Sequence, residues 1–198
     1  MSKTRQNIWG PIIAAFFIFN PFKIIMAQDD MLLIDDRTSG DYLASSGGEW
    51  RLITDGVMGG ISDGRLSIDV VDNQGCVRLK GDVKLDNNGG FVQVALDLPK
   101  EAVQDIQSYT GLTVEVHGNN EQYNIHLRTR DNSFPWQSYR AIFTAAPEWE
   151  KLYLPFTEFT PYRTSKPFDA SRLKRIGIVA IGREFRADLC ISTLGFYR

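Results

Sequence analysis

Turn-forming residues recur along this chain at intervals of roughly ten positions, and this spacing constrains the fold more than any other feature of the sequence. Between the turns, apolar residues alternate with polar ones or stand in short bursts. Alternation with a period of two is typical of β-strands that bury one face, whereas a helix would need a 3.6-residue period. The pattern therefore predicts an all-β protein.

Roughly ten strands are expected, without the alternation of strands and helices that accompanies parallel sheets. A hydrophobic fraction of 43% in 198 residues is enough for one substantial core. We expect a jelly-roll β-sandwich of two antiparallel sheets. The clearest strand segments are 31–34, 50–53, 65–71, 76–80, 91–98, 139–144, 149–154, 173–180 and 187–197.

Residues 112–128 form the most regular pattern, and we interpret them as a hairpin with its loop at residues 118–121. In this register the apolar sides coincide, with Val116 opposite Tyr123 and Leu112 opposite Leu127. The other face is either solvated or one wall of a polar binding groove. That face carries Thr113, Glu115, His117, Gln122, Asn124, His126 and Arg128.

The N-terminus resembles a secretory signal. Lys3 and Arg5 precede an apolar run over residues 12–19, which is too short to cross a bilayer comfortably, and Ala27 is a small residue suited to cleavage. We expect residues 1–27 to be a signal peptide and residues 28–198 to be one exported domain, periplasmic or extracellular. An uncleaved N-terminal anchor is the alternative, and the mature chain has no expected integral membrane segment.

Charge and cysteine content limit the partners and the compartment. Residues 1–27 contain three basic residues and no acid, so their removal would make the chain more acidic than its full net charge of −2. An acidic chain argues against nucleic acid as a partner. Cys76 and Cys190 lie in separate expected strands. An oxidising compartment would permit a disulfide between them, and two buried free thiols are the equal alternative.

Residues 55–62 concentrate an aspartate and three glycines around Met58. This composition predicts a tight turn that needs a positive φ or a close backbone approach. We take Asp55, Met58, Gly59, Gly60 and Ser62 as candidate binding residues. Met58 is either an apolar contact for a partner or a plug at the end of the sandwich.

A second set of candidates lies in residues 128–140, where aromatic and basic residues are interleaved. Arg128, Trp136 and Tyr139 could stack on and hydrogen-bond a sugar. Aromatic residues that cap the sandwich end are the alternative interpretation of this segment.

The sequence provides no basis for catalysis or metal binding. Its two histidines, His117 and His126, are expected to be ordinary surface residues, and its cysteines are far apart. No nucleophile-elbow motif or phosphate-binding glycine spacing occurs. We therefore predict a protein that is not an enzyme, with no catalytic residue, no metal site and no cofactor.

These segments together resemble the complex I intermediate-associated protein 30 family. The resemblance covers roughly residues 31–198, and its most specific part is the 55–62 run. It rests, in order, on Trp50, residues 55–62, Gly81, residues 88–91, Tyr123, residues 127–128, the 139–143 strand, Trp149, residues 154–156 and Phe159.

The resemblance implies a galactose-binding-like β-sandwich, a fold that carbohydrate-binding modules also use. Mitochondrial relatives act as assembly factors for respiratory complex I, and a plant relative assists photosystem assembly with a connection to RNA. An exported chain would lie outside the compartment of complex I assembly, so only the fold is carried over.

Two hypotheses for function remain. The first is a non-catalytic protein-binding or assembly factor whose client is a membrane-associated complex. The 55–62 turn would be its contact surface. The alternative is a carbohydrate-binding module that uses Arg128, Trp136, Tyr139 and the polar hairpin face.

Overall fold

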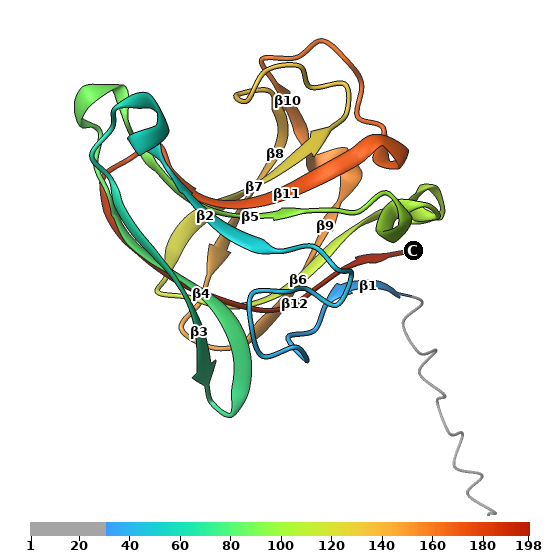
Figure 1. Ribbon diagram of the computed structural model, residues 1–198, viewed down its shortest axis with the longest axis horizontal. Coiled ribbons are helices and arrows are strands. Elements are labelled where there is room, and N and C mark those ends of the chain that lie inside the picture. Colours follow the sequence, from blue (N-terminus) through green and yellow to red (C-terminus); the bar gives the residue numbers. More distant parts are fainter. Residues whose placement is uncertain (1–30) are drawn as a thin grey trace, which may run out of the picture.

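The computed structural model describes residues 31–198, which form two stacked antiparallel β-sheets (Figure 1). In sheet I the strands follow the order β3-β4-β12-β6-β9, and β1 also pairs with β12. Sheet II has the order β10-β8-β7-β11-β5-β2. Both sheets are antiparallel throughout, which confirms the predicted all-β sandwich of galactose-binding-like, jelly-roll type.

The strand bounds agree closely with the expected segments. Sheet I consists of β1 (Met31–Asp35), β3 (Asp63–Val71), β4 (Gln74–Val83), β6 (Gly111–His117), β9 (Glu150–Pro155) and β12 (Phe185–Tyr197). Sheet II consists of β2 (Trp50–Thr54), β5 (Phe91–Asp97), β7 (Glu121–Thr129), β8 (Ser138–Ala145), β10 (Thr160–Tyr162) and β11 (Leu173–Ile181). Short 3-10 turns connect them: η1 (Asp55–Met58), η2 (Asp86–Asn88), η3 (Glu101–Val103), η4 (Ile106–Ser108), η5 (Phe156–Glu158) and η6 (Ala170–Arg172).

The predicted hairpin over residues 112–128 is wrong in its pairing. β6 pairs with β12 and β9 in sheet I, while β7 pairs with β8 and β11 in sheet II, so Val116 lies opposite Ile191 and Tyr123 opposite Phe143. The inward residues were predicted correctly, since Leu112 and Leu127 are both fully buried. Alternation determines which side chains enter the shared core, but it does not determine which strand lies alongside.

The polar face expected on that hairpin is consequently divided between the two outer surfaces of the sandwich. His117 lies on the outer face of sheet I, whereas Asn124, His126 and Arg128 lie on the outer face of sheet II. Sheet II is curved, with its outer face concave. η1 and η2 rise at one side of this face, and β8 and β10 rise at the other (Figure 1).

The expected signal peptide, residues 1–27, lies outside the described residues. Within residues 31–198 no helix has the length and apolar character needed to cross a membrane.

Candidate functional site

The 55–62 turn is held together by one buried carboxylate. Asp55 is fully buried and accepts hydrogen bonds from the backbone N–H of Ser62 at 3.0 Å and of Gly90 at 2.6 Å, as well as from the Ser62 hydroxyl. Burial opposes ionisation of Asp55, but these hydrogen bonds outweigh it and lower the pKa of its carboxyl. Asp55 therefore ties η1 to the segment that follows η2.

The two glycines of the turn serve this arrangement. Gly59 has a φ of 90°, and a Cβ added to Gly60 would lie 2.3 Å from Cγ of Asp55. The positive φ and the close approach expected from the sequence are both present. Asp55, Gly59, Gly60 and Ser62 thus maintain the backbone of the turn, and no polar group of Asp55 is exposed to a ligand.

Met58 is the exception among these candidates. Its side chain is 61% exposed and that of the adjacent Val57 is 73% exposed, so Met58 does not plug the core. Two more apolar side chains are exposed nearby: Ile61 lies between η1 and β3, and Leu85 lies between β4 and η2. We call Val57, Met58, Ile61 and Leu85 the apolar crest.

The structure brings Arg128 and Trp136 together at the end of β7. Arg128 donates hydrogen bonds to the backbone oxygens of Phe134 at 3.0 Å and Gln137 at 3.2 Å, which fixes the loop between β7 and β8. Trp136 stacks on Phe134 with ring centroids 4.9 Å apart, and both rings are about half exposed. Arg128 therefore fixes the loop that carries this aromatic pair. Its own side chain is half buried on the outer face of sheet II.

Tyr139 does not join them, because it is fully buried. Its hydroxyl donates to the backbone oxygens of Lys166 and Pro167 at 3.0 and 3.1 Å, and its ring packs edge-on against Phe168 at 5.1 Å. Tyr139 anchors the loop after β10 and is not available to a ligand.

A row of polar residues crosses the outer face of sheet II, and of its members only His126 was expected on a polar face. We call Gln93, His126, Arg140 and Tyr162 the polar row. In the strand register, Gly177 of β11 lies opposite His126 of β7, and His126 lies opposite Arg140 of β8. Gln93 of β5 extends over Gly177, whose added Cβ would lie 2.9 Å from the Gln93 Nε2 atom. The row thus crosses most of the concave sheet.

His126 is the most unusual member of the row. It is only 8% exposed, contrary to the expected surface histidine. Its Nε2 atom forms no hydrogen bond within residues 31–198. Burial, reinforced by the charge of Arg140, lowers the pKa of His126 to about 3. The imidazole is therefore neutral near pH 7 and has one donor and one acceptor nitrogen.

Arg140 links this histidine to an aromatic ring. Its guanidinium carbon lies 3.4 Å from the ring centroid of Tyr162, and its Nε donates to the Ser138 hydroxyl at 3.0 Å. Tyr162 belongs to the edge strand β10 and is 36% exposed. The side-chain amide of Gln93 is not hydrogen-bonded to any described residue. The row therefore combines hydrogen-bonding groups with one accessible aromatic ring.

No group of three or more His, Cys, Asp or Glu side chains in residues 31–198 is arranged to hold a metal ion. The two histidines lie on different sheets, so they cannot act together.

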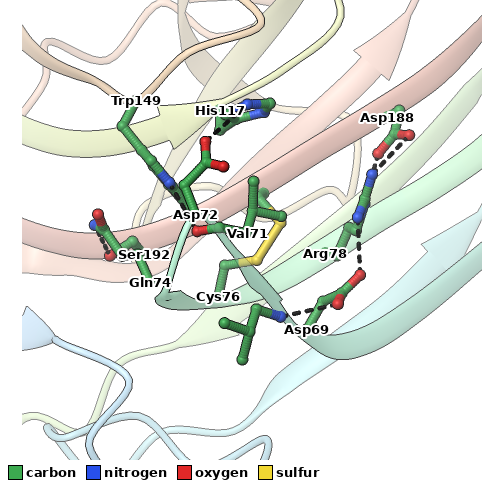
Figure 2. The surroundings of a disulfide bond; sticks show 12 residues. Asp69, Val71, Asp72, Gln74, Cys76, Arg78, His117, Trp149, Asp188 and Ser192 are labelled. Carbon is green, nitrogen blue, oxygen red and sulfur yellow. Dashed lines mark hydrogen bonds and ion pairs between the residues drawn. A yellow bond between two sulfur atoms is a disulfide. The ribbon is translucent and has the colours of Figure 1, made fainter.

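The outer face of sheet I, on the opposite side of the sandwich, carries a disulfide. Cys76 of β4 and Cys190 of β12 are bonded, which decides between the two alternatives left open by the sequence (Figure 2). Nearby, Arg78 pairs with Asp188 at 2.7 Å and with Asp69 at 2.8 Å. The indole of Trp149 donates to the Val71 backbone oxygen at 3.1 Å. These contacts join β3, β4, β12 and the residue that precedes β9.

Comparison with known protein families identifies the chain. The model of the family described as complex I intermediate-associated protein 30 (CIA30) matches residues 41–191. The chain belongs to this family. No curated protein matches this CIA30-family member with significance.

Solved structures similar to this CIA30-family protein include carbohydrate-binding modules. A family 11 module from Clostridium thermocellum, in complex with a β-1,3-1,4-mixed-linked tetrasaccharide, has a TM-score of 0.65 at 10% identity, covering 83% of this chain and 94% of that one. A family 30 module has a TM-score of 0.58 at 12% identity, covering 87% of this chain and 88% of that one. At these identities the similarity establishes the shared sandwich fold and nothing further.

Proposed function

We propose that this CIA30-family protein is a non-catalytic carbohydrate-binding protein, and that it holds its ligand on the concave outer face of sheet II. The observation that carries the proposal is the polar row, in which the Arg140 guanidinium lies over the partly exposed ring of Tyr162 and the amide of Gln93 lies on the same face. Sugar hydroxyls both donate and accept hydrogen bonds, so they match the amide of Gln93, which has both donors and an acceptor. A ring such as Tyr162 can stack on the apolar face of a sugar.

The fold supports the same proposal by analogy. The family 11 module to which the sandwich is similar was solved with a bound oligosaccharide. Trp136 and Arg128 remain candidates at the margin of this face, where the loop after β7 projects.

Substitution of Tyr162 tests the proposal. We expect Tyr162→Ala to weaken binding to the best polysaccharide of a broad panel about tenfold, because it removes the one aromatic platform in the row. Affinity electrophoresis or calorimetry would measure the change. Tyr153→Ala is the matched control, since Tyr153 is an exposed tyrosine on β9 of the other sheet.

Failure of the protein to bind any polysaccharide would contradict the proposal. Equal losses in Tyr162→Ala and Tyr153→Ala would contradict the location of the site.

The apolar crest favours a second function, which is the binding of a protein client at the 55–62 turn. Exposed methionine and valine side chains are adaptable contacts for such a partner. We expect Met58→Ala to change the free energy of unfolding by no more than about 0.5 kcal/mol. A photo-crosslinker at position 58 should capture a defined protein, whereas one at the equally exposed Val70 should not. Unfolding of Met58→Ala would assign Met58 to the core instead.

We also propose that the mature protein is exported. The basic and apolar N-terminal pattern supports a cleaved leader. The Cys76–Cys190 disulfide is compatible with an oxidising compartment.

A further inference from the structure

The cationic side chains around Tyr162 point to a narrower class of ligand. Arg140 lies over the Tyr162 ring at 3.4 Å, and the guanidinium of Arg163 lies 5.5 Å from the same ring. Arg128 lies on the same outer face, two residues along β7 from His126, which is opposite Arg140. We call Arg128, Arg140 and Arg163 the arginine cluster.

Within residues 31–198, none of the three arginines forms an ion pair with a carboxylate. The nearby acids are engaged elsewhere, since Asp97 pairs with Arg175 and Arg51, and Asp131 pairs with Arg172. The cluster is therefore a local excess of positive charge on a chain whose formal net charge is −2.

The cluster is partly desolvated as well as unpaired. Burial lowers the pKa of Arg128 and of Arg140, more than Asp97 raises the first and Tyr162 raises the second. Charge that is held close together and out of water interacts more strongly with an incoming anion than exposed surface charge does.

We propose that the ligand is an anionic oligosaccharide, and that Arg140 and Arg163, with Arg128 beside them, bind its carboxylate or sulfate groups while Gln93 binds its hydroxyls. This inference rests on the proposed carbohydrate-binding function and specifies its ligand class. Guanidinium groups match both anions geometrically, because each presents paired oxygens to paired N–H donors.

The test uses the intact mature protein and four probes of similar length: an oligogalacturonate, a sulfated galactan fragment, a neutral mixed-linked β-glucan and polyglutamate. We expect one of the two anionic glycans to bind at least tenfold more tightly than the neutral glucan, with an affinity that falls as salt is raised. Comparison of the first two probes identifies which anion is recognised. Polyglutamate should not compete at matched charge.

Variants locate the effect. Arg140→Gln should weaken binding of the anionic glycan at least tenfold and Arg140→Lys less, because lysine keeps the charge but not the planar fork. Arg163→Gln is a second variant on an exposed side chain, whose removal should not disturb folding. Arg65→Gln, on an exposed residue of β3 in the other sheet, is the control.

The outcomes separate this inference from the proposed function. Equal affinity for neutral and anionic glycans, unchanged in Arg140→Gln and Arg163→Gln, would overturn the inference and leave carbohydrate binding intact. Competition by polyglutamate would overturn it in favour of unspecific charge attraction. Absence of binding to every glycan would overturn both.

Discussion

Asp55→Ala is expected to lower the free energy of unfolding by roughly 3 to 5 kcal/mol, because it removes a buried carboxylate and leaves the N–H groups of Ser62 and Gly90 without their acceptor. At 2–4 °C per kcal/mol for a chain of this size, the melting temperature should fall by about 10 °C. Chemical denaturation of wild type and variant would measure the difference. Asp63→Ala is the control, since Asp63 is exposed.

The glycines of the turn provide an independent check. Gly60→Ala would place a Cβ 2.3 Å from Asp55 Cγ, whereas a Cβ at Gly59 meets nothing within 4 Å and suffers only from the positive φ. Gly60→Ala should therefore be the more destabilising of the two. An Asp55→Ala protein that melts within about 2 °C of wild type would show that the turn does not depend on this carboxylate.

Loss of the disulfide should have an effect of similar size. Cys76 and Cys190 are 114 positions apart, and closing a loop of about that length stabilises a fold by about 4 to 5 kcal/mol in the chain-entropy description. The double variant Cys76→Ser with Cys190→Ser should be less stable by this amount in denaturant titrations. The surrounding contacts of Arg78 and Trp149 should preserve the fold itself (Figure 2).

Reducing agent provides the matched control for this prediction. It should lower the stability of wild type toward that of the double variant and leave the double variant unchanged. Two free thiols in the purified protein under non-reducing conditions would contradict the prediction.

Most of the fold could be predicted because the strands bury one face and therefore alternate. The segments expected at 50–53 and 173–180 correspond to β2 and β11 within one residue. β10 was missed because it has only three residues, all exposed, and includes Pro161, so it carries no apolar alternation. The hairpin at 112–128 was wrongly predicted because two strands of different sheets bury alternate residues in the same pattern as two neighbouring strands of one sheet.

The candidate site was less predictable, because it depends on which strands are neighbours. His126 was identified as part of a polar face, but its proximity to Arg140 and Tyr162 requires the order of β7, β8 and β10. Tyr139 alternates with Ala141 and Phe143, and this pattern was the available signal that it points inward. Asp55 was expected as a binding residue, and the structure shows its carboxylate accepting hydrogen bonds from the backbone of the turn.

Chemical-shift mapping on the isotope-labelled mature protein would locate the ligand most directly. Titration with the tightest-binding glycan should move the amide resonances around His126, Arg140 and Tyr162, on the concave face of sheet II (Figure 1). Shifts confined to Val57 and Met58, or to the outer face of sheet I, would contradict carbohydrate binding at the polar row.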